Sequence, residues 1–295
     1  MYRINNLKIL FWNSQSMNNK EEQLISLTNK FNPEIICLNE TWFNPNRNYK
    51  FHPYNIIRND REDGYGGTAI LIKNKINVIT NVSKNYTNGP KDSTLQIQMI
   101  TIEITENNKP YELYIINTYS SNQKTDMTKL TEFIRLNNVK TDRLIMLGDF
   151  NSKHLSWGCH TEDRNGETLY DLCESNNLLI HNTLQFIPTR LTSPQNNNSY
   201  TDLTISSMDL SLQINYNILD DTYGSDHFPS ITELNASYSH STEYLIDDNP
   251  SKEIKIDNWK SFNRELSKKL KTYTNPDYDI FYTSQIGRAS CRERV

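Results

Sequence analysis

This 295-residue sequence has few cysteines and glycines and no long apolar run. It contains four cysteines and nine glycines. Four cysteines at irregular spacing do not make the disulfide framework of a secreted scaffold, so we expect a reducing compartment, with Cys37 and Cys173 as buried thiols. No apolar stretch reaches the roughly 20 residues of a membrane-spanning helix, and the first residues lack the apolar region of a signal peptide. The sequence therefore predicts a globular protein with no membrane partner.

Positive charge is also in short supply. Lysine and arginine number 31 against 35 acidic residues, which gives a formal net charge of -4. Domains that bind nucleic acid are often strongly basic, so composition does not point to one. It does not exclude one either, because a bound cation can supply the missing positive charge at a phosphate.

The most informative stretch is residues 144–151, where four apolar residues run into a glycine and two polar residues. A short apolar run that ends in a turn signal predicts a buried strand. Because alternate strand residues point the same way, Asp149 and Asn151 should face one side where the strand ends. Gly148 would let the backbone bend or approach a neighbour. The stretch alone leaves two interpretations open, a ligand site at a sheet edge and a plain Asx-type turn.

Similar apolar runs predict a fold built from two mixed sheets. A strand at 8–13, a helix ending at Asn32 and a strand at 35–38 indicate a βαβ-like opening, with Asn18 or Asn19 capping the helix. Hairpins join some later strands and helices join others, which favours an α/β fold of two packed sheets with helices outside. Further strands are predicted at 54–58, 68–73, 95–104, 113–118, 178–180, 201–205 and 228–234, another begins at Leu144, and helices are predicted at 128–137 and 167–176.

The pattern loosens after Ala236. Residues 237–252 are polar and linker-like, and residues 259–270 have helical spacing with many lysines. The last ten residues resemble the translation of a sequencing-adapter oligonucleotide, so we treat them as foreign. We predict one domain over residues 1–236, a linker and helical connection over 237–285, and a foreign tail over 286–295, in a protein that naturally continued further.

Several predicted strands end in polar residues. Alone, each has a simple explanation, such as a solvated strand end for Glu40 or a satisfied surface histidine for His227. Together, in chain order and on strand ends, they predict a site. The residues are Asn13, Glu40, Asn117-Thr118-Tyr119, Asp149 with Asn151, Tyr200-Thr201-Asp202 and Ser225-Asp226-His227.

This ordered set resembles the motifs of the endonuclease/exonuclease/phosphatase family, to which exonuclease III, apurinic endonucleases and DNase I belong. Segments 58–70 and 148–158 are similar to the endonuclease domain of non-LTR (LINE-like) retrotransposons. The resemblance covers roughly residues 7–234. It implies a four-layer α/β sandwich with two mixed β-sheets packed face to face.

The resemblance implies metal-dependent cleavage of a phosphodiester. Mg²⁺, with Mn²⁺ as an alternative, prefers oxygen ligands and commonly takes only one or two carboxylates. Glu40 is implied as the principal ligand, with Asn13 beside it and Asp226 contributing. Asp149 would orient and deprotonate the attacking water.

Further residues are implied as partners of the phosphate. His227 would contact it while Asp202 holds the imidazole in one tautomer. Asn151 and Tyr119 would donate hydrogen bonds to phosphate oxygens. The remaining predicted substrate-binding residues are Asn117, Ser225 and Arg190, the last beside a loop at 192–199 that would probe DNA.

The leading prediction is a Mg²⁺-dependent endonuclease that nicks one strand of double-stranded DNA and leaves a 3′-hydroxyl group. In a longer natural protein that hydroxyl would prime a fused reverse transcriptase, and a nuclear location follows only from this substrate. Alternatives are an abasic-site repair endonuclease, a lipid or inositol phosphatase of the same fold, and a DNA-binding remnant without catalysis. A zinc cluster of His154, Cys159 and His160 matches no ligand spacing with a mechanical basis.

Overall fold

The computed structural model describes residues 6–62, 64–87, 94–106, 109–122, 124–184, 187–191 and 199–238. The chain divides into two compact units, Met1–Thr242 and Glu243–Val295, and all described residues belong to the first. Most of the predicted linker, the helix at 259–270, the foreign tail and residues 192–198 of the predicted DNA-probing loop lie outside the described residues. Within the described ranges no helix has the length and apolar character needed to span a membrane.

The first sheet has six strands among the described residues, in the order β11-β12-β1-β2-β4-β3. Its central strands β1 (Leu7–Asn13) and β2 (Ile35–Asn39) run parallel and are joined by helix α1 (Glu21–Phe31), which confirms the βαβ opening. The other strands add antiparallel on both sides. They are β3 (Tyr54–Asn59), β4 (Thr68–Lys73), β11 (Ile214–Ile218) and β12 (Ser230–Leu234).

The second sheet has seven strands in the same part of the chain, in the order β13-β6-β7-β8-β10-β9, with β5 also paired to β6. Its β7 and β8 are parallel, and the other pairs are antiparallel. The strands are β5 (Val78–Thr87), β6 (Thr94–Glu106), β7 (Lys109–Ser120), β8 (Leu144–Asp149), β9 (Leu178–Ile180), β10 (Asp202–Ser207) and β13 (Ser237–Tyr238). The accompanying helices are α2 (Thr128–Leu136), α3 (Arg164–Ser175), α4 (Met208–Ser211), and the 3₁₀ turns η1 (Thr141–Arg143), η2 (Leu155–Trp157) and η3 (His181–Leu184).

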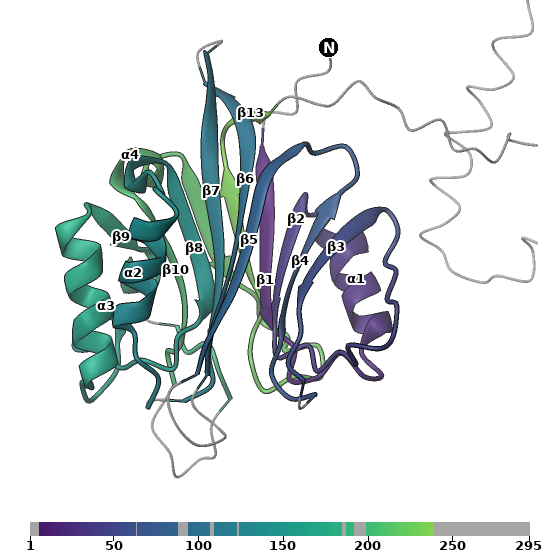
Figure 1. Cartoon of the computed structure of the whole chain (residues 1–295), viewed down its shortest axis with the longest axis horizontal. Helices are drawn as coiled ribbons and strands as arrows, with labels where there is room; N and C mark the ends of the chain where they lie inside the picture. The colour runs from purple at the N-terminus through teal and green to yellow at the C-terminus, as the bar shows by residue number, and fades with distance from the viewer. Residues whose placement is uncertain are drawn as a thin grey trace, which may run out of the picture. The chain divides into compact units, whose positions relative to one another are not determined.

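The two sheets pack face to face, with α1 outside the first and α2 and α3 outside the second (Figure 1). Consecutive residues of one strand therefore point to opposite faces of the sheet, one toward the other sheet and the next toward the helices. In β8, Ile145 and Leu147 pack between the sheets, whereas Leu144 and Met146 pack with residues of α2 and α3. Burial on both faces is why these strands read as continuous apolar runs. The layers confirm the predicted four-layer α/β sandwich.

Some elements differ from the sequence predictions. No strand was predicted at β5 or β11; β5 is largely exposed and polar, so no apolar run marks it. Helix α1 begins at Glu21, its N-cap position is occupied by Lys20, and no side chain caps it. The predicted caps at Asn18 and Asn19 are therefore wrong, because tertiary contacts of the preceding loop fix the start of this helix.

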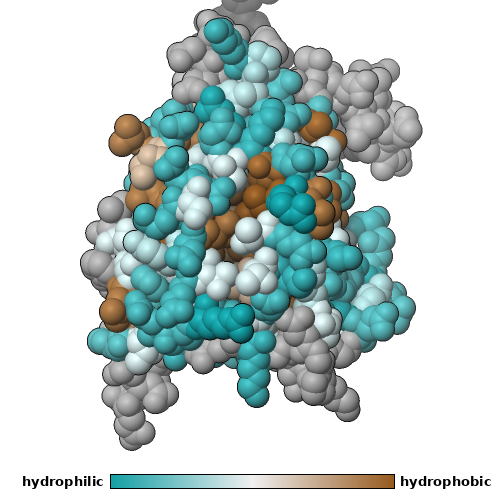
Figure 2. Space-filling model, turned by 60° about the vertical axis from the view of Figure 1, so that its left-hand side comes forward, coloured by the Kyte–Doolittle hydropathy of each residue, from teal (hydrophilic) through white to brown (hydrophobic). Residues whose placement is uncertain are grey.

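Hydrophilic residues cover most of the face shown in Figure 2, and apolar residues gather near its middle and at points on its rim. The predicted burial of two thiols is confirmed, since Cys37 and Cys173 are both buried, as is Cys159. Burial in apolar surroundings raises the pKa of the Cys173 thiol to about 12. These cysteines therefore behave as core residues rather than as nucleophiles.

Gly148 allows strands β7 and β8 to approach closely. A Cβ atom at this position would lie 2.0 Å from the carbonyl oxygen of Thr118. The backbone of β8 cannot move away, because it is paired with β7 on one side and β10 on the other. The glycine therefore serves a close approach of two strands, one of the two roles that the sequence suggested.

We predict that Gly148→Ala lowers the free energy of unfolding by about 2 kcal/mol or more, because the new methyl group overlaps fixed backbone atoms. Urea denaturation followed by circular dichroism measures this. Asp171→Ala, on the exposed side of α3, is the control and should change stability by less than about 0.5 kcal/mol. An unchanged unfolding midpoint for Gly148→Ala would contradict the packing argument.

Candidate active site

Two asparagines join the two sheets by hydrogen bonds near the ends of β2 and β7. Asn39 Nδ2 donates to the Thr118 carbonyl oxygen at 2.7 Å, and Asn117 Nδ2 donates to the Leu38 carbonyl oxygen at 3.0 Å. Both asparagines are fully buried. The exchange fixes how the ends of β2 and β7 lie against each other. Asn117, predicted to bind substrate, thus donates to the backbone of the other sheet.

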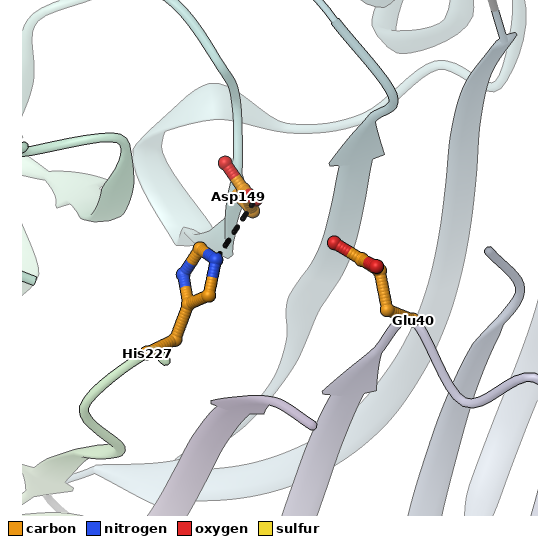
Figure 3. Close-up of side chains that lie close together, drawn as sticks. All are labelled: Glu40, Asp149 and His227. Atoms are coloured by element: carbon orange, nitrogen blue, oxygen red, sulfur yellow. Dashed lines mark ion pairs between the residues drawn. The ribbon is translucent and has the colours of Figure 1, made fainter. Parts of the chain in front are cut away.

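Three side chains from distant parts of the sequence form the acidic cluster. Glu40 follows β2, Asp149 ends β8, and His227 lies in the loop before β12. Each offers one atom, and these atoms lie within 4.8 Å of one another. Figure 3 shows the carboxylates of Glu40 and Asp149 and the imidazole ring turned toward one shared space. Asp149 and His227 are about 1% exposed, so Glu40 is the member that solvent reaches.

Asn13 brackets the two carboxylates. Its Nδ2 donates to Glu40 Oε1 at 2.9 Å and to Asp149 Oδ2 at 3.0 Å. Its own oxygen accepts the Gln15 backbone N–H at 3.1 Å. The sequence predicted Asn13 beside a metal ion; in the structure its nitrogen donates to both carboxylates and its oxygen accepts one backbone hydrogen bond.

Asp149 and Asn151 form the Asx-type turn that was one interpretation of their stretch. The Asn151 backbone N–H donates to Asp149 Oδ1 at 3.1 Å, which is an Asx turn, and Asn151 adopts a left-handed φ of 44°. The Asn151 amide nitrogen lies 3.5 Å from Asp149 Oδ2 and donates to the Ser120 carbonyl oxygen at 2.7 Å. Strand alternation is therefore not what brings these side chains together; the turn after the strand does.

Burial and the nearby charge of Asp202 raise the pKa of Asp149 above its ordinary value, although His227 opposes this. Asp202 lies opposite Asp149 in the antiparallel register of β10 and β8. An aspartate whose pKa is raised is a stronger base than an ordinary one once it is ionised.

His227 is held by Asp202. Its Nδ1 lies 2.7 Å from Asp202 Oδ2, the pairing expected from the sequence. Burial alone lowers the pKa of His227, but the charge of Asp202 and this hydrogen bond outweigh burial, so the pKa is raised. The other ring nitrogen, Nε2, faces Asp149 Oδ2 at 3.9 Å and Asp226 Oδ1 at 3.7 Å. The imidazole is thus oriented and carries positive charge at the cluster.

Tyr119 and Ser225 border the same space. Burial, followed by the charges of Glu40 and Asp149, raises the pKa of Tyr119, so the phenol stays protonated and hydrogen-bonds Glu40. The Ser225 hydroxyl donates to the Asn13 carbonyl oxygen at 2.7 Å and accepts a hydrogen bond from the His227 backbone N–H at 3.1 Å. Ser225, predicted to bind substrate, therefore holds the loop before β12, residues 219–229 (the histidine loop), against β1.

Lys20 was not identified from the sequence. Its Nζ donates to the carbonyl oxygens of Ser14 at 2.6 Å and Gln15 at 3.2 Å, and it senses the charges of Asp226 and Glu40. It lies in a loop rather than at a strand end, so the strand-end pattern could not find it. Only the packing of that loop brings this cation to the cluster.

The donor set fits a hard divalent cation. Carboxylate oxygens of Glu40 and Asp149 converge, and Asp226 Oδ1 is buried with no hydrogen-bond partner among the described residues. Mg²⁺ prefers such oxygen ligands. Of the residues considered for a zinc cluster, His154 pairs with Glu162 at 3.2 Å.

We predict that Asn13→Asp lowers the free energy of unfolding by about 2 kcal/mol or more at pH 8, because two donated hydrogen bonds become carboxylate repulsion. The new carboxyl group has a raised pKa in the folded state, so its penalty grows as pH rises above its unfolded pKa of about 3.9. The loss should therefore be smaller at pH 5 than at pH 8.

Thermal unfolding at the two pH values measures this difference. Asn217→Asp, the same change at an exposed position of β11, is the matched control and should show little pH dependence. Equal losses for Asn13→Asp at both pH values would argue against the bracketing role of Asn13.

Comparison with known proteins gives two sequence matches. A family model described as endonuclease-reverse transcriptase matches residues 113–231, which run from β7 into β12. A DNA-(apurinic or apyrimidinic site) endonuclease of Dictyostelium discoideum is 30% identical over 130 residues, covering 41% of this chain. The match spans about a third of that curated relative, 32% of its length.

Solved structures share the fold. The endonuclease domain of TRAS1, a telomere-specific non-LTR retrotransposon, aligns with a TM-score of 0.59 at 20% identity, over 77% of this chain and 97% of that one. A mannosyl-6-phosphatase of Bacteroides thetaiotaomicron aligns with a TM-score of 0.59 at 13% identity, over 77% and 99%. At these identities the likeness shows the fold. In sequence, the chain is similar to endonuclease-reverse transcriptases over residues 113–231 and to an apurinic endonuclease over 130 residues.

Proposed function

We propose that this chain is a Mg²⁺-dependent endonuclease that nicks one strand of double-stranded DNA and leaves a 3′-hydroxyl group. The observation that supports this best is the convergence of Glu40, Asp149 and His227 within 4.8 Å. Hydrolysis of a phosphodiester needs a cation on the phosphate, an activated water and stabilisation of the leaving group. The cluster offers a residue for each of these needs.

Glu40 and the buried oxygen of Asp226 are the groups that would hold the cation, and Mn²⁺ would be accepted by the same oxygens. When bound, the cation neutralises charge on the phosphate. Asp149, with its raised pKa, orients and deprotonates the water. The protonated His227, paired with Asp202, places positive charge where negative charge builds on the phosphate.

Two further donors face the phosphate in this proposal. Tyr119 keeps its proton because its pKa is raised, so its phenol can donate. The Asn151 amide lies beside Asp149 and keeps that carboxylate and the phosphate in line. Both act by fixing positions, which is a large part of catalysis in phosphoryl transfer.

The sequence match to endonuclease-reverse transcriptases and the fold shared with the TRAS1 domain support a role in a non-LTR retrotransposon. In that role the 3′-hydroxyl primes a reverse transcriptase fused in the longer protein, and the enzyme works on nuclear DNA. The Dictyostelium relative favours a second candidate, cleavage at abasic sites. The same residues serve either substrate, so only a direct comparison separates them.

We predict that the full chain nicks supercoiled plasmid DNA with Mg²⁺ and not with EDTA. Asp149→Asn should slow nicking by about 100-fold or more, because it removes the base while keeping the shape of the side chain. Asp171→Asn makes the same change on the exposed side of α3 and should leave the rate unchanged. Nicking at the wild-type rate by Asp149→Asn would refute the assignment.

We also expect intact and abasic duplexes to be cleaved at comparable rates, with ends that a DNA polymerase can extend. Cleavage of labelled duplexes on denaturing gels and subsequent primer extension measure both. A strong preference for the abasic duplex would assign the protein to repair. Phosphate release from an inositol phosphate, or DNA binding without any turnover, would instead support the phosphatase or the non-catalytic alternative.

A further inference from the structure

Residues 187–191 connect the base of the 192–198 loop to the histidine loop. The Leu191 backbone N–H donates to the Asp226 carbonyl oxygen at 2.7 Å, and the Phe228 N–H donates to the Thr189 carbonyl oxygen at 2.9 Å. The Thr189 N–H in turn donates to the Ser199 carbonyl oxygen at 2.9 Å. The segment is therefore bonded both to the far end of the loop and to the residues that flank His227.

Arg190, in the middle of this segment, pairs with Asp226. Its Nε lies 2.8 Å and its Nη2 lies 2.7 Å from the same carboxylate oxygen, Oδ2. The other oxygen, Oδ1, is buried, has no hydrogen-bond partner among the described residues, and stops 3.7 Å from His227 Nε2. One oxygen is thus held by the guanidinium, and the other stands just outside hydrogen-bond range of the histidine.

The position of Asp226 matters because Nε2 is the histidine nitrogen turned toward the cluster. Asp202 occupies Nδ1, so when the imidazole carries both protons, as the proposed function requires, Nε2 is the N–H from which a phosphate oxygen can accept a hydrogen bond. A carboxylate free to turn would bind this N–H in a charge-assisted hydrogen bond, which is about 2.7–2.9 Å long and stronger than a neutral one. It would then compete with the phosphate.

We infer that Arg190 is a positioning residue: by holding Asp226 Oδ2, it keeps this carboxylate off His227 Nε2 and leaves the imidazole N–H for the phosphate. The inference rests on the function proposed for this site. It replaces the direct substrate contact that the sequence suggested for Arg190.

Lys20 cannot take over this task. It is near enough to Asp226 for their charges to interact, but its Nζ is bonded to the carbonyl oxygens of Ser14 and Gln15 at 2.6 and 3.2 Å. Turning it toward Asp226 would release both bonds. The backbone hydrogen bonds on either side of Arg190 join its segment to residues 226 and 228. They keep the Arg190 side chain next to the Asp226 carboxylate.

Arg190→Met, made in the full chain, is the test variant. It removes the charge and keeps the aliphatic stem, which lines an apolar cavity of about 420 Å³ with Leu191 and Phe228. We expect kcat for nicking to fall about tenfold or more with KM for DNA changed less than about threefold, because DNA binding is not what is lost. Arg190→Lys keeps a cation but loses the two N–H groups that hold Oδ2, so its kcat should lie between those of wild type and Arg190→Met.

The same change in an Asp226→Asn background is the decisive comparison. Asp226→Asn alone should slow nicking, because Asp226 also belongs to the proposed cation site, so the rates compared are those of Asp226→Asn with and without Arg190→Met. Without the Asp226 carboxylate, no charged group competes with the phosphate for His227 Nε2. Arg190→Met should therefore alter kcat by less than about twofold in this background. Equal losses in both backgrounds, with a raised KM, would show that Arg190 contacts DNA directly and would overturn the inference. Loss of folding by Arg190→Met would overturn it too, because partly exposed ion pairs contribute little to stability.

A measurement without turnover separates this inference from the proposed function. In protein labelled with ¹⁵N-histidine, the signals of His227 are assigned by their absence in His227→Gln. Arg190→Met should move the Nε2 resonance toward that of a hydrogen-bonded nitrogen, and the double variant Arg190→Met/Asp226→Asn should not. An unmoved Nε2 resonance overturns the inference whether or not the wild-type chain nicks DNA.

Discussion

The site depends on two hydrogen bonds between the sheets, from Asn39 to the Thr118 carbonyl oxygen and from Asn117 to the Leu38 carbonyl oxygen. Much of the space between the sheets is filled by apolar side chains, and hydrophobic packing has no direction. Amide hydrogen bonds do have direction, and a buried amide left unpaired costs about 1–3 kcal/mol. The two asparagines therefore fix how far one sheet is shifted along the other. In that arrangement Glu40, after β2, meets Asp149 at the end of β8.

The cost of this arrangement is electrostatic. Glu40, Asp149 and Asp202 bring three carboxyl groups together beside a single imidazole, and their mutual repulsion and burial raise the pKa of Asp149. The Asn13 amide, donating to two of these groups, offsets part of the repulsion. A cluster with more acidic than basic groups suits a cation. Its electrostatic repulsion shifts pKa values at the place where chemistry is expected. Stability and function thus draw on the same residues.

The success of the strand predictions has a physical basis. Strands β4 and β9 begin and end where predicted. The central strands β1, β2 and β7 are shifted by a few residues but were found, because burial on two faces demands uninterrupted apolar residues. Strands β5 and β11 lie at sheet edges with exposed faces, so they carry no such pattern. The cap of α1 was mispredicted for a related reason: the loop before it is shaped by its contacts with residues 39–41, which are distant in sequence.

The sequence by itself determined which chemical groups are available and in what order along the chain, because an apolar run ending in a carboxylate, amide or imidazole is visible in the residues alone. Only the tertiary structure decided what each group does. Asn13 reaches Asp149 across 136 positions of sequence, Asn117 bonds the opposite sheet, and Arg190 pairs with Asp226. A polar side chain takes its role from the atoms within about 3 Å of it, and those neighbours are set by the packing of the sheets.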